Sequence, residues 1–152
     1  MLNRSLQDFS RQVVEIMPQI YREFAKREDN ELMTGKISFP QMVTLQYVSN
    51  KKCVNMKCIA NNLGIKMSSA STLVDRLIRE KMLSRRHDEK DRRIVWISMT
   101  SKGTKVIRHI LDQKQRSTRE IFSVLTERER QQYLGLLKKA YLQQLKHEKF
   151  NK

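Results

Sequence analysis

Residues 63–103 constrain the fold more than any other part of the chain. Apolar residues recur at steps of three and four across 67–81, which is the spacing of a helix with one buried face. Two short runs follow, at 83–87 and 94–99, and the second is rich in the β-branched and aromatic residues that strands prefer. Between them, residues 88–93 carry no apolar side chain. This pattern predicts a helix followed by a β-hairpin with a charged tip.

A second helix is expected directly before the first. Asn55 is a suitable N-cap for a short helix over 56–63, and Gly64 is a suitable C-terminal stop. Two helices joined by a short turn that contains glycine form a helix-turn-helix pattern. Because Lys66 occupies the cap position of the next helix, one of the serines after it is expected to serve as the cap.

Helix dominates the rest of the chain. The first segment carries one apolar stripe at helical spacing up to Phe24, and a polar loop is expected over 27–35. Ser38 and Gln41 form a predicted capping box at the start of a helix that ends near Asn50.

Two further helices are expected after the hairpin. Thr100 is the predicted cap of a helix that reaches about Val124, and Thr126 with Glu129 predicts a second capping box before the last helix. Residues 147–152 read as a frayed basic tail. The fold class expected is therefore mainly α with a small β-wing.

The positive charge is concentrated in the last two thirds of the chain. The net charge is +15. Residues 1–50 are neutral, with 6 basic and 6 acidic groups; 51–100 carry 12 and 5, net +7; 101–152 carry 13 and 5, net +8. This distribution favours a polyanionic partner such as nucleic acid. No helix shows the clean apolar face opposite a lysine stripe that an anionic membrane surface would favour.

Other function classes have little support. No apolar run approaches the roughly 20 residues that span a bilayer, and the N-terminus lacks the apolar core of a signal peptide, so a cytoplasmic chain is expected. Cys53 and Cys58 are then expected to be buried, inert thiols. The three histidines are scattered, and no metal-ligand spacing or nucleophile–base pairing occurs. We expect neither an enzyme nor a bound cofactor or metal.

The helix over 67–81 carries small hydroxyl residues suited to base edges. Serine and threonine donate to or accept from most bases, and their size lets a helix enter the major groove deeply. The candidates for base contact are Ser68, Ser69, Ser71 and Thr72. Arg76 and Arg79 lie further along the helix and suit phosphates, while Lys66 adds positive charge at its start.

The hairpin carries five basic residues: Arg85, Arg86, Lys90, Arg92 and Arg93. Arginine at a hairpin tip suits a narrow minor groove, where the negative potential is enhanced. Asp91 would be out of place if phosphate binding were the only task, so its expected role is to pair with an arginine and to shape the tip.

Three motifs in order resemble one known family. They are Leu73-Val74-Asp75-Arg76-Leu77, Asp91-Arg92-Arg93 and Met99-Thr100-Ser101-Lys102-Gly103. Together they resemble the MarR (multiple antibiotic resistance regulator) family of bacterial transcription factors. The matching core covers residues 55–103, and the order of helices extends the resemblance over nearly the whole chain. Two positions depart from the usual pattern, Lys66 in place of Ser or Thr and Cys58 in place of Glu.

The resemblance implies a winged helix-turn-helix dimer. Residues 1–35 and 101–152 would form long dimerisation helices, and 36–100 the DNA-binding lobe. Arg93 would be the minor-groove arginine and Asp91 its ionic partner. Family members are often released from DNA by a small phenolic or anionic ligand between the dimer helices and the lobe. Here that crevice would draw on Met17, Tyr21, Met42, Leu45 and Gln46, although each of these also suits a plain core position.

The expected function is therefore a homodimeric, sequence-specific regulator of transcription that binds double-stranded DNA at a palindromic operator as a repressor. Two alternatives stay open. A protein-interaction module, such as an anti-repressor, would use the winged helix to bind another regulator. A non-specific nucleic-acid binder would account for the basic C-terminal third, which dimer helices do not require.

Overall fold

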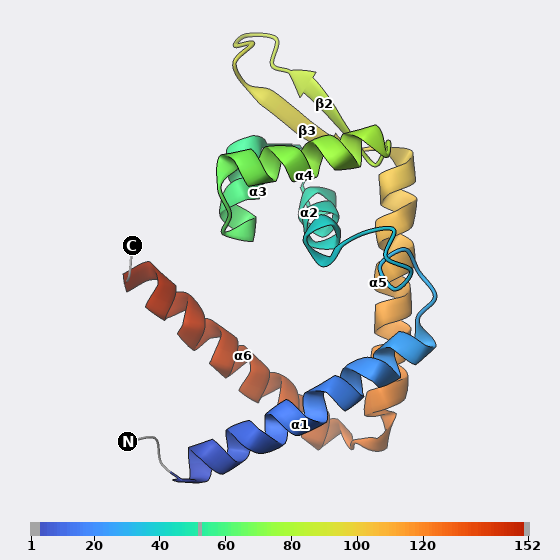
Figure 1. Cartoon of the computed structure of the whole chain (residues 1–152), viewed down its shortest axis with the longest axis vertical. Helices are drawn as coiled ribbons and strands as arrows, with labels where there is room; N and C mark the ends of the chain where they lie inside the picture. Colours follow the sequence, from blue (N-terminus) through green and yellow to red (C-terminus); the bar gives the residue numbers. More distant parts are fainter. Residues whose placement is uncertain (1–3, 52, 151–152) are drawn as a thin grey trace. The chain divides into compact units, whose positions relative to one another are not determined.

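A computed structural model describes residues 4–51 and 53–150 of the chain, and Figure 1 traces them. The chain forms two compact units, Met1–Gln115 and Arg116–Lys152. The elements in order are α1 (Arg4–Arg27), α2 (Phe39–Ser49), β1 (Val54–Asn55), α3 (Met56–Leu63), α4 (Met67–Arg79), β2 (Leu83–His87), β3 (Val95–Met99), α5 (Ser101–Ile121), the 3-10 turn η1 (Phe122–Val124) and α6 (Glu127–Phe150). The prediction of a mainly α chain with a small β-wing is confirmed.

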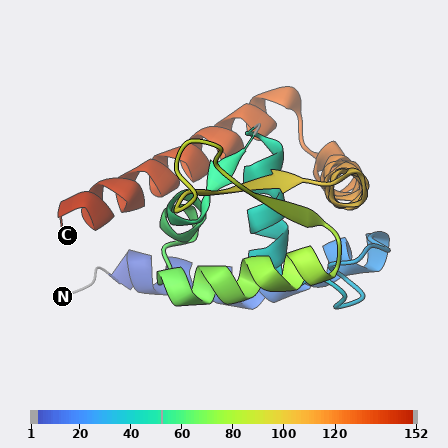
Figure 2. The same cartoon turned by 90° about the horizontal axis from the view of Figure 1, so that it is seen from above.

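Helices α2–α4 and a three-stranded sheet form the winged-helix lobe. The sheet is antiparallel in the order β1-β3-β2, so β3 is central. Ile97 on β3 is fully buried, and its cross-strand partners are Val54 and Arg85. Viewed from above, α4 runs along one side of the sheet (Figure 2). One apolar core joins these elements; its members are Ile37, Met42, Leu45, Val48, Val54, Ile59, Ala60, Ala70, Val74, Leu77, Met82, Leu83, Ile97, Ile107 and Ile110.

The caps expected at the first lobe helices are present. The Ser38 side chain accepts from the Gln41 amide, and the Gln41 side chain accepts from the Ser38 amide, which completes the capping box of α2. Asn55 caps α3 by accepting from the Cys58 amide at 2.9 Å. Gly64 ends α3 in the left-handed region at φ 64°, where glycine avoids the strain of a side chain. The helix-turn-helix geometry therefore follows from local sequence signals.

The N-cap of α4 differs from expectation. Lys66 itself is the N-cap residue, with extended backbone and no side-chain capping bond among the described residues. The prediction that a serine would serve as the cap is wrong, because α4 begins at Met67 and Ser68 and Ser69 already lie in its first turn.

Helix α4 is shorter than expected, ending at Arg79 instead of residue 81. Lys81 adopts φ 59°, a conformation that costs a non-glycine residue about 1 kcal/mol. Its amide donates to the Ile78 carbonyl and the next amide, of Met82, donates to the Leu77 carbonyl, each at 2.9 Å. This pair of bonds is a Schellman motif, which stops the helix.

The end of α4, the start of β2 and the start of α5 meet at Met82. The Thr100 amide donates to the Met82 carbonyl at 3.1 Å, and the Thr100 hydroxyl lies within donating distance of the carbonyls of Lys81 and Met82, at 2.7 and 3.0 Å. The Thr100 hydroxyl also accepts from the Gly103 amide at 3.0 Å, which confirms Thr100 as the cap of α5. A Cβ on Gly103 would lie 2.1 Å from the Met82 carbonyl oxygen, so only glycine permits this approach.

A polar network fixes the α1–α2 loop against α5, and the loop is seen beside that helix in Figure 1. The Asn30 side chain donates to Gln113 Oε1 at 3.0 Å, and Gln113 Nε2 donates to the Asp29 carbonyl at 2.9 Å. The Glu28 carboxylate is fully buried and lies 3.5 Å from Lys114 Nζ. Buried polar groups need such partners, so these bonds determine the path of the loop.

Other boundaries differ by a few residues. Helix α1 continues to Arg27, strand β3 begins at Val95, and α5 ends at Ile121 before the 3-10 turn. Helix α6 begins at the predicted capping box, in which the Glu129 amide donates to the Thr126 hydroxyl at 3.3 Å. The prediction of a frayed tail is wrong for residues 147–150, which belong to α6. Residues 151 and 152 lie outside the described residues.

Replacing Gly103 with alanine should destabilise the lobe by about 1–3 kcal/mol, because the new methyl group would overlap the backbone of Met82. Urea unfolding followed by circular dichroism measures the change. Gly135→Ala is the matched control: no atom of the described chain lies within 4 Å of a Cβ built there, inside α6. Alanine at that position should stabilise the chain by up to roughly 1 kcal/mol. Equal effects of the two substitutions would contradict the role of Gly103.

Candidate nucleic-acid interface

The outer face of α4 presents small polar side chains. Ala70, Val74 and Leu77 bury the opposite face in the core. Ser68, Ser69 and Thr72 are exposed, whereas Ser71 is half-buried. The Thr72 hydroxyl donates back to the Ser68 carbonyl at 3.1 Å, which leaves its oxygen lone pairs available to an outside donor. The structure thus brings the predicted base-edge residues onto one helical surface, with Ser71 at its margin.

Two of the predicted phosphate-binding arginines are paired with carboxylates. Arg76 Nε lies 3.1 Å from Glu80 Oε1, one turn along α4. Arg85, on β2, forms an ion pair with Asp75 on α4. This second pair joins the helix to the first strand of the wing. Arg79 and Arg86 are exposed. The phosphate role of all four arginines stays a prediction.

The tip of the wing holds the motif Asp91-Arg92-Arg93. The Arg93 amide donates to Asp91 Oδ1 at 3.0 Å, and Arg93 Nε lies 3.3 Å from the same oxygen. The Arg93 side chain is 94% exposed, so packing does not hold it. Asp91 therefore orients an arginine that projects from the hairpin, the arrangement expected of an arginine that enters a groove. The hairpin itself extends beyond helices α2–α4 (Figure 1).

Asp88 organises the start of the same tip. Its Oδ1 accepts from the amides of Lys90 and Asp91, at 2.9 and 3.1 Å. Its Oδ2 accepts from Trp96 Nε1 at 2.8 Å. The indole bond, then the two backbone bonds, hold the pKa of Asp88 below the ordinary aspartate value, because each favours the charged carboxylate.

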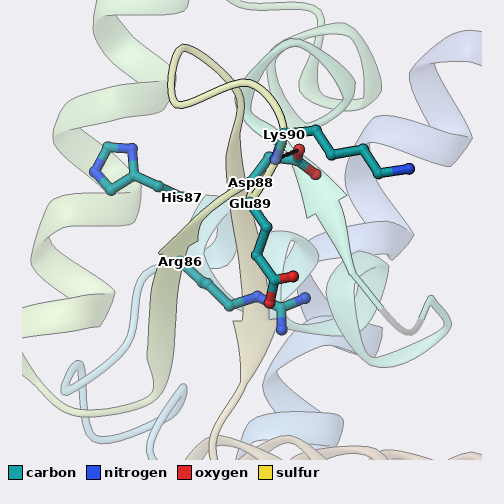
Figure 3. Close-up of a pocket in the computed structure, with 5 residues that line it drawn as sticks. All are labelled: Arg86, His87, Asp88, Glu89 and Lys90. Carbon is teal, nitrogen blue, oxygen red and sulfur yellow. Dashed lines mark hydrogen bonds between the residues drawn. The ribbon is translucent and has the colours of Figure 1, made fainter.

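A shallow hollow of about 370 Å³ opens beside the tip, lined by Arg86, His87, Asp88, Glu89 and Lys90. Figure 3 shows His87 and Lys90 extending in opposite directions from the start of the loop. His87 Nδ1 lies 2.9 Å from the Arg92 carbonyl, across the loop. The hollow is part of the wing surface, and its lining is polar, with two basic and two acidic side chains.

Sequence reasoning missed three residues of this site. Asp75 appeared only as part of a motif, and neither Asp88 nor Trp96 was assigned a role. A signal was present for one pair, since the single tryptophan of the chain falls in a short hairpin, close to a tip that has no apolar side chain. A tryptophan there needs a partner for its N–H.

The candidate effector residues are spread over two settings. Met42 and Leu45 are buried in the core of the lobe, and Gln46 is half-buried on α2. Met17 and Tyr21 lie on α1 with 37% and 66% of their surface exposed. A hollow along α1 is lined by a separate set, Phe9, Gln12, Val13, Glu15, Ile16 and Gln19. A shared ligand site for the five residues stays a prediction.

The two cysteines are free thiols, and Cys58 is half-buried in α3. The prediction that Cys53 is buried is wrong: it is exposed in the connection before β1, where Val54 takes the buried position. Within residues 4–51 and 53–150, no group of three or more His, Cys, Asp or Glu side chains is arranged to hold a metal ion. No helix of that described part is long and apolar enough to cross a membrane.

The lobe with its helix-turn-helix and wing matches a known family model over residues 37–95, described as the MarR family. A Bacillus subtilis protein described as the uncharacterized HTH-type transcriptional regulator YfiV is 30% identical over 108 residues, which cover 70% of this chain and 68% of that protein. The chain belongs to the MarR family. Members of this family are transcriptional regulators that bind DNA, and not enzymes.

Solved structures agree on the fold. A MarR family protein from Bacillus stearothermophilus superposes with a TM-score of 0.76 at 21% identity, covering 95% of this chain and 99% of that one. BpsR from Bordetella bronchiseptica gives a TM-score of 0.61 at 21% identity, covering 86% and 98%. The BpsR structure is described as a mechanism for regulation of DNA binding by 6-hydroxynicotinic acid.

The bonds to Asp88 make the wing sensitive to strong acid. Because the folded-state pKa lies below the ordinary value of about 3.9, the carboxylate stabilises the tip above that value, and the contribution is lost as pH falls through the lowered pKa. Fluorescence of Trp96 should therefore stay constant from pH 7 to 5 and change below about pH 4. In Asp88→Asn, fluorescence should change only together with acid unfolding of the helices, seen by circular dichroism, and the separate change should be absent. A midpoint above pH 5 would contradict the assignment.

Proposed function

We propose that this MarR-family regulator is a homodimeric repressor that reads a palindromic operator with α4 and the wing. The observation that carries the proposal is the exposed Arg93 side chain, held at a wing tip by Asp91 beside a helix with a small hydroxyl surface. Ser68, Ser69, Ser71 and Thr72 would contact base edges in the major groove. Arg93 would enter the adjacent minor groove, where its charge meets the enhanced negative potential.

The remaining basic side chains would position the protein on the phosphates. These are Lys66, Arg76, Arg79, Arg85, Arg86 and Arg92, with Asp91 as the ionic partner of Arg93. Arg76 and Arg85 are 58% and 49% exposed at the side chain, so a phosphate can approach while the pairs with Glu80 and Asp75 persist. Contacts of this type fix register and orientation without reading sequence.

Exposed apolar surface supports the dimer. On α1, Phe9 and Tyr21 are 62% and 66% exposed; on α6, Leu136 and Tyr141 are 67% and 64% exposed. Large exposed apolar side chains gathered on helices are typical of an interaction surface, and burial against a second copy would remove them from water. Residues 1–35 and 101–152 are accordingly proposed as the dimerisation region and 36–100 as the DNA-binding lobe.

A dimer seated on a promoter would exclude polymerase, which is the physical basis for repression. The regulation of BpsR by 6-hydroxynicotinic acid supports a small phenolic or anionic effector for this chain as well. Met17, Tyr21, Met42, Leu45 and Gln46 are the proposed contacts, contributed by α1 and α2.

Selection of bound fragments from random double-stranded DNA should return a palindrome with half-sites roughly 34–36 Å apart, the repeat of one DNA turn. Binding to the selected site should fall by roughly 10³–10⁵ between 50 and 200 mM salt if six to ten phosphates are contacted. Recovery of unenriched sequence with the same salt response would identify a non-specific binder. A folded dimer with no DNA binding at low salt would identify a protein-interaction module.

Arg93→Ala should weaken binding to the selected operator by about 1–3 kcal/mol, the value of one good groove contact. Fluorescence anisotropy of labelled operator measures the change, and random-sequence DNA gives the non-specific reference. Lys139→Ala, a charge removed from α6, is the control and should leave operator affinity within a factor of about two. If Arg93→Ala weakens binding to operator and to random DNA equally, Arg93 contacts a phosphate and not a particular groove.

Sedimentation should give twice the chain mass of 18.1 kDa. Leu137→Glu, which places a charge on the apolar side of α6, should shift the protein toward monomer, because burying an unpaired carboxylate is unfavourable. Lys139→Glu adds the same side chain two residues away, on the other side of the helix, and should leave the dimer intact. A monomeric wild-type chain at micromolar concentration would exclude the proposed dimer.

A further inference from the structure

The exposed Arg93 side chain owes its direction to a series of hydrogen bonds that begins at Trp96 on β3. Trp96 Nε1 donates to Asp88 Oδ2, and Asp88 Oδ1 accepts from the Asp91 amide. Asp91 Oδ1 then accepts from the amide and Nε of Arg93. The Asp88 carboxylate thus connects the Trp96 side chain to the backbone at Asp91, and the Asp91 carboxylate connects that part of the loop to Arg93.

The backbone of the loop closes around the same residues. The Asp88 amide donates to the Ile94 carbonyl, and the Ile94 amide donates to the Asp91 carbonyl, both at 2.9 Å. No residue of 88–94 belongs to the apolar core: its buried residues on the hairpin are Leu83 and Ile97, and Val95, which packs against it partly buried, is the residue nearest the tip. Polar contacts therefore replace packing as the source of order in residues 88–94.

Trp96 is the fixed end of the series. Its backbone pairs with Asn55 of β1 on one side and with Arg86 of β2 on the other, so it lies in the central strand. The indole is half-buried, which limits the positions its N–H can take. Asp88, by contrast, lies in the loop and needs the indole bond to hold its second oxygen.

We propose that Trp96 and Asp88 are positioning residues for Arg93, and that they act on operator affinity only by fixing the turn from which Asp91 presents that arginine. The inference rests on the proposed function, since it names what supports the groove contact. The bond from the Trp96 indole stabilises the loop conformation because its acceptor, Asp88, is a charged carboxylate. Charge-assisted hydrogen bonds are about twice as strong as neutral ones. Neither residue needs to touch DNA for this effect.

The test is a double-mutant cycle on operator affinity. Trp96→Phe keeps an aromatic ring and removes the N–H donor, and should weaken operator binding roughly three- to tenfold, the equivalent of one hydrogen bond. In an Arg93→Ala background the same substitution should have an effect below about twofold, because the contact that it supports is already gone. Asp88→Asn, which keeps the shape of the side chain and removes its charge, should behave in the same way.

Arg79→Ala is the matched control for the cycle. Arg79 lies on α4, outside the hydrogen-bonded series, so its effect should add fully to that of Trp96→Phe. The indole N–H resonance of the single tryptophan gives a readout that needs no DNA: it should move in Asp88→Asn and stay unchanged in Arg93→Ala. Unchanged midpoints of urea unfolding would show that the lobe remains folded in the variants.

The outcomes separate this inference from the function on which it rests. If Arg93→Ala weakens operator binding and Trp96→Phe does not, the positioning role is overturned and the proposed function stands. If Trp96→Phe is equally damaging in both backgrounds, tryptophan acts independently of Arg93 and the inference is wrong. If the wild-type protein selects no operator, the proposed function itself fails, while the indole resonance still tests the bond to Asp88.

Discussion

The Met82 carbonyl is the point at which the end of α4, the wing and the start of α5 are joined. It accepts from the amide of Thr100 and lies within donating distance of its hydroxyl, and Gly103 leaves the space that this approach requires. One residue later Leu83 pairs with Met99, so the open end of the hairpin is closed at the same place. The Asp75–Arg85 ion pair adds a second connection between α4 and β2. Together these contacts hold the base of the wing against α4.

This joint explains why two separated motifs occur together in the sequence. Met99-Thr100-Ser101-Lys102-Gly103 supplies the cap, the glycine and Lys102, whose Nζ donates to the Glu80 carbonyl at 2.7 Å. Leu73-Val74-Asp75-Arg76-Leu77 supplies two buried residues, the partner of Arg85 and the arginine paired with Glu80. Most positions of the two motifs therefore pack in the core of the lobe or form a hydrogen bond or ion pair within it. The resemblance to the family is therefore carried in large part by residues that fix the wing against the helix.

The sequence was sufficient wherever a local signal determines structure. Capping residues placed the starts of α2, α3, α5 and α6, and Gly64 placed the turn between α3 and α4. It failed at Lys81, since a lysine in the left-handed region contradicts the usual preference for glycine, and the Schellman bonds override it. It also failed for contacts between distant residues. Asn30 and Gln113 lie 83 positions apart, and no periodicity or spacing in the sequence predicts the hydrogen bond between them.

The carboxylates at the candidate interface help to decide between specific and non-specific binding. Residues 63–103 hold 10 basic and 5 acidic side chains, so half of the positive charge is neutralised. A protein selected only for phosphate affinity would gain from removing those acids, because each released counterion adds to binding. Instead Asp75 pairs with Arg85 and Asp91 pairs with Arg93. Asp88 stabilises the turn at the tip of the wing through backbone and indole bonds. These acids lower the attraction to any polyanion and fix the directions of the arginines. That exchange favours a reader of particular grooves over a general binder, even with a C-terminal third of net charge +8.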